Sequence, residues 1–234
     1  MQQQTADDIY TQGQVLIFNK PLHWTSFDLV NKVRWLISHS IGKKIKVGHA
    51  GTLDPLATGL MIICTGKKTK EITTFQDHDK EYIADIKLGA TTPSFDLETE
   101  INQTYDCSFV TKPLAEETLK TFLGRQIQYP PVFSAKKING KRVYESARRG
   151  EQVKTRPQEI EIKEIELLDF KDYIIKVRVL CSKGTYIRTL ADDLGKRLNT
   201  GAHLIGLKRT KIGNITLNNA MQIEDFEKIF IKKD

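Results

Sequence analysis

The stretch Gly48–Lys70, GHAGTLDPLATGLMIICTGKKTK, decides the fold of this 234-residue chain. Its first half, Gly48–Gly59, is dense in glycine, threonine and proline, which predicts a loop. The apolar run Leu60–Cys64 predicts a strand after this loop, and Ile45–Val47 predicts a short strand before it. A loop between two buried strands is positioned by its scaffold, so its polar side chains are candidates for function.

Working outward, the apolar patterning predicts a succession of strands and helices. The strands are expected where apolar residues are continuous or alternate, at residues 14–18, 80–88, 159–170, 173–181 and 204–215. The helices are expected where caps or apolar stripes occur, at residues 25–40, 114–123, 185–198 and 223–231. Gly89–Pro113 is polar and is expected to be a solvated excursion. Because strands and helices interleave without a strict βαβ rhythm, the expected fold class is α+β, or mixed α/β, rather than doubly wound.

The organisation of the chain predicts one continuous domain. Neither an internal repeat nor a low-complexity linker divides residues 13–234, and residues 1–12 are polar and acidic, as in a flexible tail. This beginning lacks the basic and apolar regions of a secretory signal. No apolar run approaches the roughly 20 residues of a membrane-spanning helix. We therefore expect a cytoplasmic protein with no membrane partner, and a monomer.

Charge points to a polyanionic partner. Lysine and arginine number 36 against 29 acidic residues, a net charge of +7. Basic residues gather in Lys136–Arg156 and again in Leu194–Ile223, a range without any acid. Such runs fit binding to a phosphate backbone, although an ordinary solvated surface explains them equally well. The three cysteines lie far apart without a C-x-x-C pair, which argues against a structural zinc site.

Asp54 is the acidic residue of the central loop. In isolation, Asp54-Pro55 would be interpreted as a turn initiator. The loop also carries His49 and two threonines, and its glycines allow a ligand to approach closely. A phosphate-binding P-loop is excluded, because Gly59 and Gly66 have six residues between them where that pattern needs four. The G-x-x-G of Gly48–Gly51 is too short a signal to indicate a KH domain.

Nine short motifs, together with the central stretch, occur in a consistent order along the chain. They are Phe18-Asn19-Lys20-Pro21, Trp24-Thr25-Ser26, Lys80-Glu81-Tyr82, Leu88-Gly89, Pro130-Pro131, Ser134-Ala135, Cys181–Arg188, Gly201–Leu204 and Leu207–Thr210. The ordered set closely resembles the TruB family of tRNA pseudouridine synthases. The resemblance implies the pseudouridine synthase fold, with a long mixed, mainly antiparallel central sheet flanked by helices and loops.

The resemblance also implies a reaction and a partner. These enzymes isomerise a uridine at position 55, in the T-loop of tRNA, to pseudouridine. The N1–C1′ bond breaks, the uracil turns, and a C5–C1′ bond forms. This isomerisation needs no cofactor and no metal, and the expected partner is the T-arm stem-loop of tRNA.

The family match assigns the catalytic roles to three residues. Asp54 matches the nucleophilic aspartate, and a carboxylate can form a covalent intermediate and still leave. Arg188 matches the arginine that pairs with this carboxylate. Tyr82 matches the tyrosine that stacks on the base and lies near the departing C5 proton. On pattern alone, Tyr82 is an inward strand residue and Arg188 an exposed helix cation. Whether Asp54 attacks C1′ or C6 stays open.

Further residues match substrate-binding positions. Tyr186 and Leu207 match residues that line the uracil pocket, and Lys20 matches a residue that supports the active-site loop. His49 matches the histidine that fills the space left by the extruded base. The basic segment 132–156 resembles the thumb that closes on RNA, and we expect four of its side chains to bind RNA: Lys136, Lys137, Arg148 and Arg149.

One departure and three alternatives accompany this interpretation. Many family members carry a PUA domain after the catalytic core, whereas the resemblance here ends near Phe230, so no PUA domain is expected. The alternatives are a non-catalytic RNA-binding module, a guide-dependent relative inside a ribonucleoprotein, and a glycosidase. The last needs two carboxylates, and the Asp54 loop offers no second acid.

Overall fold

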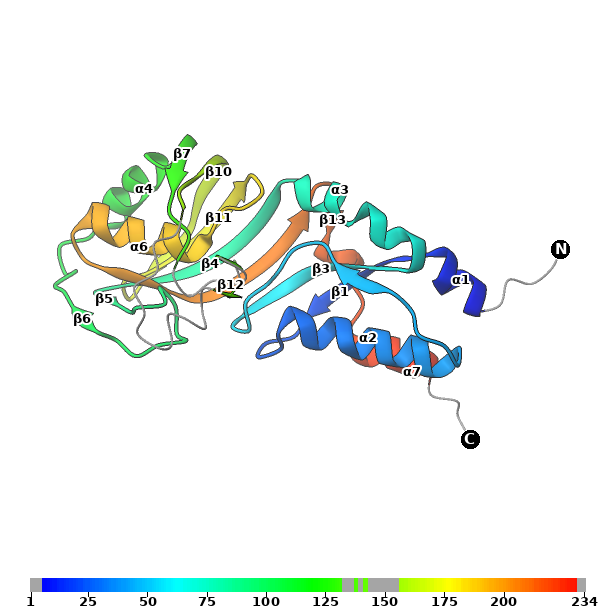
Figure 1. Ribbon diagram of the computed structural model, residues 1–234. Helices are drawn as coiled ribbons and strands as arrows, with labels where there is room; N and C mark the ends of the chain where they lie inside the picture. Colours follow the sequence, from blue (N-terminus) through cyan, green and yellow to red (C-terminus); the bar gives the residue numbers. More distant parts are fainter. Residues whose placement is uncertain (1–5, 132–136, 139–140, 143–155, 231–234) are drawn as a thin grey trace. The chain divides into compact units, whose positions relative to one another are not determined.

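The computed structural model describes residues 6–131, 137–138, 141–142 and 156–230 (Figure 1). The chain forms two compact units. Unit 1 comprises residues 1–81 and 208–234, and unit 2 comprises residues 82–207. We expected one domain over residues 13–234, and the structure divides this range so that both ends of the chain build the first unit.

Unit 1 contains strands covered by helices. Its elements are α1 (Ala6–Gln12), β1 (Val15–Lys20), α2 (Ser26–Ser40), β2 (Val47–His49), β3 (Ala57–Thr65), the 3-10 helix η1 (Gly66–Glu71), α3 (Ile72–Asp77), β13 (Ile215–Thr216), the 3-10 turn η2 (Leu217–Asn219) and α7 (Ile223–Phe230). Strand β3 pairs antiparallel with β1, where Lys20 is opposite Gly59. It also pairs antiparallel with β2, where His49 is opposite Ile63. The strand that the sequence predicts at residues 45–47 therefore lies two residues later in the chain, at Val47–His49.

Strand β3 is apolar along its length because both of its faces are buried. Met61 and Ile63 pack into a cluster with Phe18 of β1 and with the apolar stripes of α2 and α7. Leu60, Ile62 and Cys64 belong to a second cluster on the other face. In Figure 1, α2 and α7 lie side by side along the strands of unit 1. The continuous run at Leu60–Cys64 is therefore a strand buried on both faces, as its sequence predicts.

Specific side chains fix the start of α2 and the position of α1. At the start of α2, the Thr25 hydroxyl accepts from the Asp28 N–H at 3.0 Å, and the Asp28 carboxylate accepts from the Thr25 N–H at 2.8 Å. This is the predicted capping box. Residues 6–12, expected in a flexible tail, instead form α1. The reason is packing: the ring of Tyr10 lies 5.9 Å from that of Phe230 and 6.5 Å from that of Phe226.

Unit 2 is built from long antiparallel strands and two helices that pack on each other. Its elements are β5 (Ala90–Thr91), β6 (Gln103–Thr104), α4 (Lys112–Lys120), β7 (Gly124–Gln128), β8 (Lys137–Ile138), β9 (Lys141–Arg142), β10 (Gln158–Lys171), β11 (Ile174–Cys181) and α6 (Ile187–Leu198). Two strands, β4 (Lys80–Leu88) and β12 (Ala202–Ile212), are divided between the units. The main sheet has the strand order β1-β3-β12-β4-β11-β10-β7, which confirms a mixed α/β fold with a large sheet flanked by helices.

Two details of unit 2 differ from the sequence prediction. The helix expected at 114–123 spans Lys112–Lys120, because the Thr111 hydroxyl caps its start. Gly124, expected to end that helix, begins β7. The hairpin of β10 and β11 is confirmed, and its turn contains two residues in the left-handed region, Asp172 and Tyr173.

Within the described ranges, no helix is long and apolar enough to span a membrane. The same residues contain no group of three or more His, Cys, Asp or Glu side chains arranged to hold a metal ion. All three cysteines are free, and burial raises the pKa of the Cys64 thiol to about 11. A thiol with that pKa is protonated and unreactive at neutral pH.

Candidate active site

The loop that carries Asp54 joins β2 to β3 and is anchored by the start of α2. The hydroxyl of Ser26 donates to the Leu53 carbonyl at 2.9 Å and accepts from the Leu53 N–H at 2.8 Å, and both residues are buried. The Ala57 N–H donates to the Asp54 carbonyl at 3.0 Å. Asp54 itself is half-buried. Its backbone is therefore held on both sides.

Arg209 of β12 is the second anchor of this loop. Its side chain is fully buried in unit 1. The guanidinium donates from Nε to the Leu60 carbonyl at 2.8 Å, from Nη2 to the Gly51 carbonyl at 3.1 Å and from Nη1 to the Thr52 carbonyl at 3.4 Å. A planar fork of donors suits three converging carbonyls. Arg209 thus fixes the segment that immediately precedes Asp54.

Gly59 allows Arg209 to reach this position. A Cβ added to Gly59 would lie 2.3 Å from the Arg209 carbonyl oxygen, and the Gly59 φ is +107°. We expect Gly59→Ala to lower the free energy of unfolding by about 3 kcal/mol or more, through backbone strain together with the clash. Urea unfolding measures this change. Gly42→Ala is the matched control, because Gly42 also has a positive φ but nothing within 4 Å of an added Cβ. Equal losses in both variants would contradict the close approach.

Lys20 is a buried cation beside the Asp54 loop. Its ammonium donates to the carbonyls of Pro21 at 2.9 Å and Trp24 at 2.5 Å, so it closes the turn between β1 and α2. Burial lowers the pKa of Lys20 to about 8, although the negative charge of Asp54 opposes this shift. The roles predicted for Lys20, in supporting the active-site loop and in binding substrate, stay predictions.

The lowered pKa of Lys20 predicts a pH-dependent stability. Between pH 8 and the ordinary value of 10.5, the folded protein releases this proton while the unfolded chain retains it. Because the unfolded state then binds more protons, the free energy of unfolding rises with pH in this window, by about 3 kcal/mol at most. Urea unfolding of wild-type protein and of Lys20→Met from pH 7 to 10 measures the difference. Parallel curves would contradict the depressed pKa.

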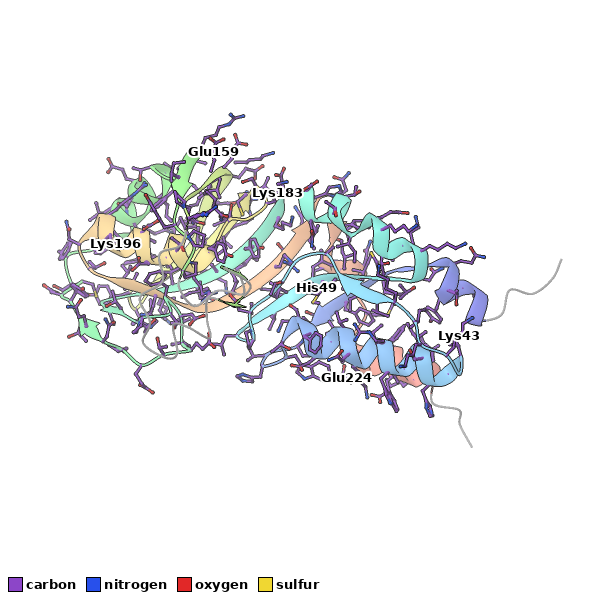
Figure 2. The ribbon with its side chains drawn as sticks, in the orientation of Figure 1. Lys43, His49, Glu159, Lys183, Lys196 and Glu224 are labelled. Atoms are coloured by element: carbon purple, nitrogen blue, oxygen red, sulfur yellow. The ribbon has the colours of Figure 1, made fainter. Side chains whose placement is uncertain are left out.

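His49, labelled in Figure 2, ends β2, where the strand register pairs it with Ile63 of β3. Burial lowers its pKa, so the imidazole is neutral at pH 7. Its Nδ1 atom is buried without a hydrogen-bond partner among the described residues. A neutral, largely desolvated ring is suited to packing against a base. The role predicted for His49 stays a prediction.

In unit 2, Arg188 lies in the first turn of α6 and is buried. Its Nε atom lies 3.7 Å from Oδ2 of Asp96, which is also buried, and its Nη1 donates to the Ser94 carbonyl at 3.4 Å. The sequence placed Asp96 in a solvated excursion, and this is wrong for Thr92, Ser94 and Asp96, which are buried. The hydroxyls of Thr92 and Ser94 donate to the Asp96 carbonyl. Pro93, between them, is exposed as expected.

The start of α6 is pinned by Gln128 of β7. The Gln128 amide accepts from the Tyr186 N–H at 2.8 Å and donates to the Tyr186 carbonyl at 3.0 Å. Thr189 adds a bond from its hydroxyl to the Tyr129 carbonyl at 3.2 Å. These contacts fix the backbone of Tyr186, a half-buried residue that lies two positions before Arg188.

The remaining predicted residues of unit 2 lie on strands. Tyr82 is 8% exposed on β4, and Leu207 is half-buried on β12. Their burial fits the lining of an apolar pocket and also fits an ordinary core, so their roles stay predictions. Lys136, Arg148 and Arg149 lie outside the described residues. Lys137 belongs to β8, of which only the backbone is described.

Several supporting residues had no role assigned from the sequence. Ser26 and Arg209 belong to the ordered motifs of the chain, but only the fold shows that they meet at the Asp54 loop. Gln128 and Asp96 carried no sequence signal beyond their polarity. A buried polar side chain bound to backbone carbonyls far along the chain leaves no local pattern. Asp54, Lys20, His49 and Arg209 belong to unit 1, whereas Tyr82, Tyr186, Arg188 and Leu207 belong to unit 2.

Comparisons with known proteins give a consistent result. The model of the TruB family pseudouridylate synthase N-terminal domain matches residues 39–187, and that of the tRNA pseudouridylate synthase B C-terminal domain matches residues 188–234. The tRNA pseudouridine synthase B of Parabacteroides distasonis is 59% identical over 219 residues, which are 93% of each chain. The protein of the same name from Phocaeicola vulgatus is 59% identical over 218 residues, again 93% of each chain.

A solved structure agrees with these relatives. The crystal structure of a Cbf5-Nop10-Gar1 complex contains a chain that superposes with a TM-score of 0.70 at 25% identity. The match covers 96% of this chain and 56% of that chain, so this protein spans little more than half of it. The family models and the relatives together cover the Asp54 loop, β4 and α6. The chain therefore belongs to the TruB family of pseudouridylate synthases.

Proposed function

We propose that this protein is a tRNA pseudouridine synthase that isomerises the T-loop uridine at position 55. The observation that carries the proposal is the construction of the Asp54 loop. Ser26 and Arg209 bind four backbone carbonyls in and beside this loop, and Asp54 is half-buried. A rigid loop that presents one carboxylate is suited to a nucleophile that must meet its target atom closely.

The proposed reaction uses three side chains. Asp54 attacks the extruded uridine, at C1′ or at C6, and forms a covalent intermediate. The N1–C1′ bond breaks, the uracil turns, the C5–C1′ bond forms, and the bond to Asp54 breaks, which releases the carboxylate. The proton on C5 then leaves to a base and N1 gains one, so that the reaction is an isomerisation. Tyr82 stacks on the base near C5, and Arg188 holds the Asp54 carboxylate ionised and directed, as the resemblance implies.

The partners follow from the same proposal. The target base is stacked inside a folded loop, so it must be extruded before Asp54 can reach it. We propose that His49 fills the vacated space and that Tyr186 and Leu207 contact the uracil. The protein acts on the T-arm stem-loop as a cytoplasmic monomer without cofactor or metal. Recognition of this kind depends on loop shape rather than on a helical groove.

Tritium release tests the proposal. A tRNA transcript labelled with tritium at uridine C5 should lose about one tritium per molecule, because a single C5 proton is exchanged per pseudouridine. A transcript with cytidine in place of uridine 55 should lose none, and an isolated T-arm hairpin should be a substrate. Tight tRNA binding without release would instead favour the non-catalytic RNA-binding module.

The basic segment 132–156 gives a separate prediction. Changing Lys136, Lys137, Arg148 and Arg149 together to glutamine should weaken tRNA binding and flatten its salt dependence. The slope of log affinity against log salt should fall by slightly less than one for each phosphate that the variant no longer neutralises. Binding titrations from about 50 to 200 mM salt measure this slope. An unchanged slope would mean that these four side chains only solvate a surface.

A further inference from the structure

Six lysines gather at one end of unit 1, outside the candidate active site. They come from two segments, the loop after α2 and the 3-10 helix η1, and we call them the lysine patch: Lys43, Lys44, Lys46, Lys67, Lys68 and Lys70. Glu71 is the one acid in residues 42–46 and 66–71, and it pairs with Lys68 at 2.7 Å. Figure 2 labels Lys43 on the loop that follows α2.

The two segments are held together by the backbone. The Gly66 N–H donates to the Lys46 carbonyl at 2.8 Å, directly beyond the β2–β3 pair of Val47 and Thr65. Arg34 of α2 adds a bond from its guanidinium to the Val47 carbonyl at 3.1 Å. The lysines from the two segments therefore belong to one scaffold, although the nineteen residues 47–65 separate the segments in sequence.

The scaffold under η1 is tightly packed. A Cβ on Gly66 would come within 2.2 Å of the Thr11 carbonyl oxygen, and the Gly66 φ is +49°. The Thr65 hydroxyl donates to the Tyr10 carbonyl at 3.0 Å and accepts from the Gln14 N–H at 2.9 Å. Helix α1 is thereby fixed against η1. The backbone that carries the η1 lysines is therefore held in place before any ligand arrives, which lowers the entropic cost of binding.

We propose that the lysine patch binds the phosphate backbone of the RNA substrate, away from the uridine that reacts. Lys43, Lys44, Lys46, Lys67 and Lys70 are exposed. Clustered like charges repel one another, and a polyanion relieves this repulsion while it releases its own counterions. This inference names a contact surface of the proposed tRNA substrate and so rests on the proposed function.

The distance of the lysine patch from the Asp54 loop predicts how loss of the patch changes KM and kcat. Strand β3 runs from the Asp54 loop to η1, and its nine residues span roughly 25 to 30 Å. A phosphate bound at the patch is therefore far from the reacting uracil. Such a contact stabilises the ground state and the transition state equally, so its removal raises KM and leaves kcat unchanged.

The test compares two variants with equal loss of charge. The patch variant carries Lys43→Gln, Lys44→Gln and Lys46→Gln. The control carries Lys120→Gln, Lys176→Gln and Lys228→Gln, and each of these lysines lies within 3.0, 3.7 or 2.8 Å of a carboxylate oxygen. Binding to an unmodified tRNA transcript is titrated at several salt concentrations, and tritium release gives kcat and KM.

We expect the patch variant to bind tRNA about tenfold more weakly at about 0.1 M salt, with a salt slope smaller by about two to three units. Its KM should rise while its kcat stays that of wild type, and the control should behave as wild type. Adding Lys67→Gln to the patch variant should weaken binding further.

Two outcomes would overturn the inference. One is a patch variant whose affinity and salt slope equal those of the control. The other is a wild-type protein that binds vesicles of phosphatidylcholine and phosphatidylserine through the patch lysines while tRNA binding does not depend on them. If no protein releases tritium, the proposed function fails. The comparison of tRNA binding between the two variants would still show whether the lysine patch binds tRNA.

Discussion

Asp54→Asn is expected to abolish pseudouridine formation, with turnover lower by at least about 10⁴-fold. The amide keeps the size of the carboxylate and the backbone contacts of the loop, but it is not a nucleophile. Affinity for tRNA should stay within a few fold of wild type, or rise slightly, because a negative charge near a polyanion is removed. Single-turnover tritium release and binding titrations measure the two quantities separately.

Asp225→Asn is the matched control, since Asp225 is an exposed aspartate on α7 whose carboxylate pairs with Lys228 at 2.8 Å. It should release tritium at the wild-type rate. The assignment of Asp54 as nucleophile fails if Asp54→Asn retains turnover within about tenfold of wild type. A variant that loses both turnover and tRNA binding should be checked for folding by urea unfolding before it is interpreted.

Arg209→Met is expected to lower both the stability and the turnover of the protein. The substitution keeps an apolar stem but leaves the carbonyls of Gly51, Thr52 and Leu60 without their donor. Loss of three hydrogen bonds and of the packing of a fully buried side chain should lower the free energy of unfolding by roughly 3–5 kcal/mol. The folded fraction should also turn over about 10²-fold more slowly, because a loop displacement near 1 Å misplaces Asp54. Urea unfolding and the kcat of the folded protein below its unfolding transition report these effects.

Lys208→Met is the control for this prediction, because Lys208 is the exposed neighbour of Arg209 on the same strand. It should change stability by about 0.5 kcal/mol or less. Arg209→Lys keeps the charge but cannot offer a planar fork, so it should recover only part of the stability. If Arg209→Met has the same stability and the same kcat as Lys208→Met, Arg209 does not anchor the loop.

Much of the fold could be predicted from local patterns. The capping box at Thr25 and Asp28 has a spacing that specifies a helix start, and the β10–β11 hairpin follows from alternation on both sides of a turn. The apolar run of β3 identified a buried strand because its five central residues leave no polar face. In each case the determining contacts lie close together in sequence.

The misses share a long-range cause. Residues 6–12 look like a polar tail, and they form α1 because Tyr10 finds Phe226 and Phe230 more than 200 residues away. Asp96 looks solvated, yet Arg188 buries it. Composition around a residue says nothing of such partners. The predicted domain organisation stays a prediction, and the structure adds that unit 1 combines the two ends of the chain.

The candidate site divides in the same way. The motif around Asp54 identified the loop, because glycine, proline and a polar run between buried strands are local features. The anchors Ser26, Arg209 and Gln128 act through backbone carbonyls and amides that lie far along the chain. Family resemblance supplied the roles of Tyr82, Tyr186 and Leu207, whose burial fits those roles without testing them.

The most direct measurement of the central claim is a map of pseudouridine in an unmodified tRNA transcript after incubation with the protein. Carbodiimide labelling followed by primer extension locates each pseudouridine to a single nucleotide. We predict one new pseudouridine, at uridine 55 of the T-loop, with wild-type protein and none with Asp54→Asn. A transcript without new pseudouridine, or with pseudouridine only outside the T-loop, would contradict this account.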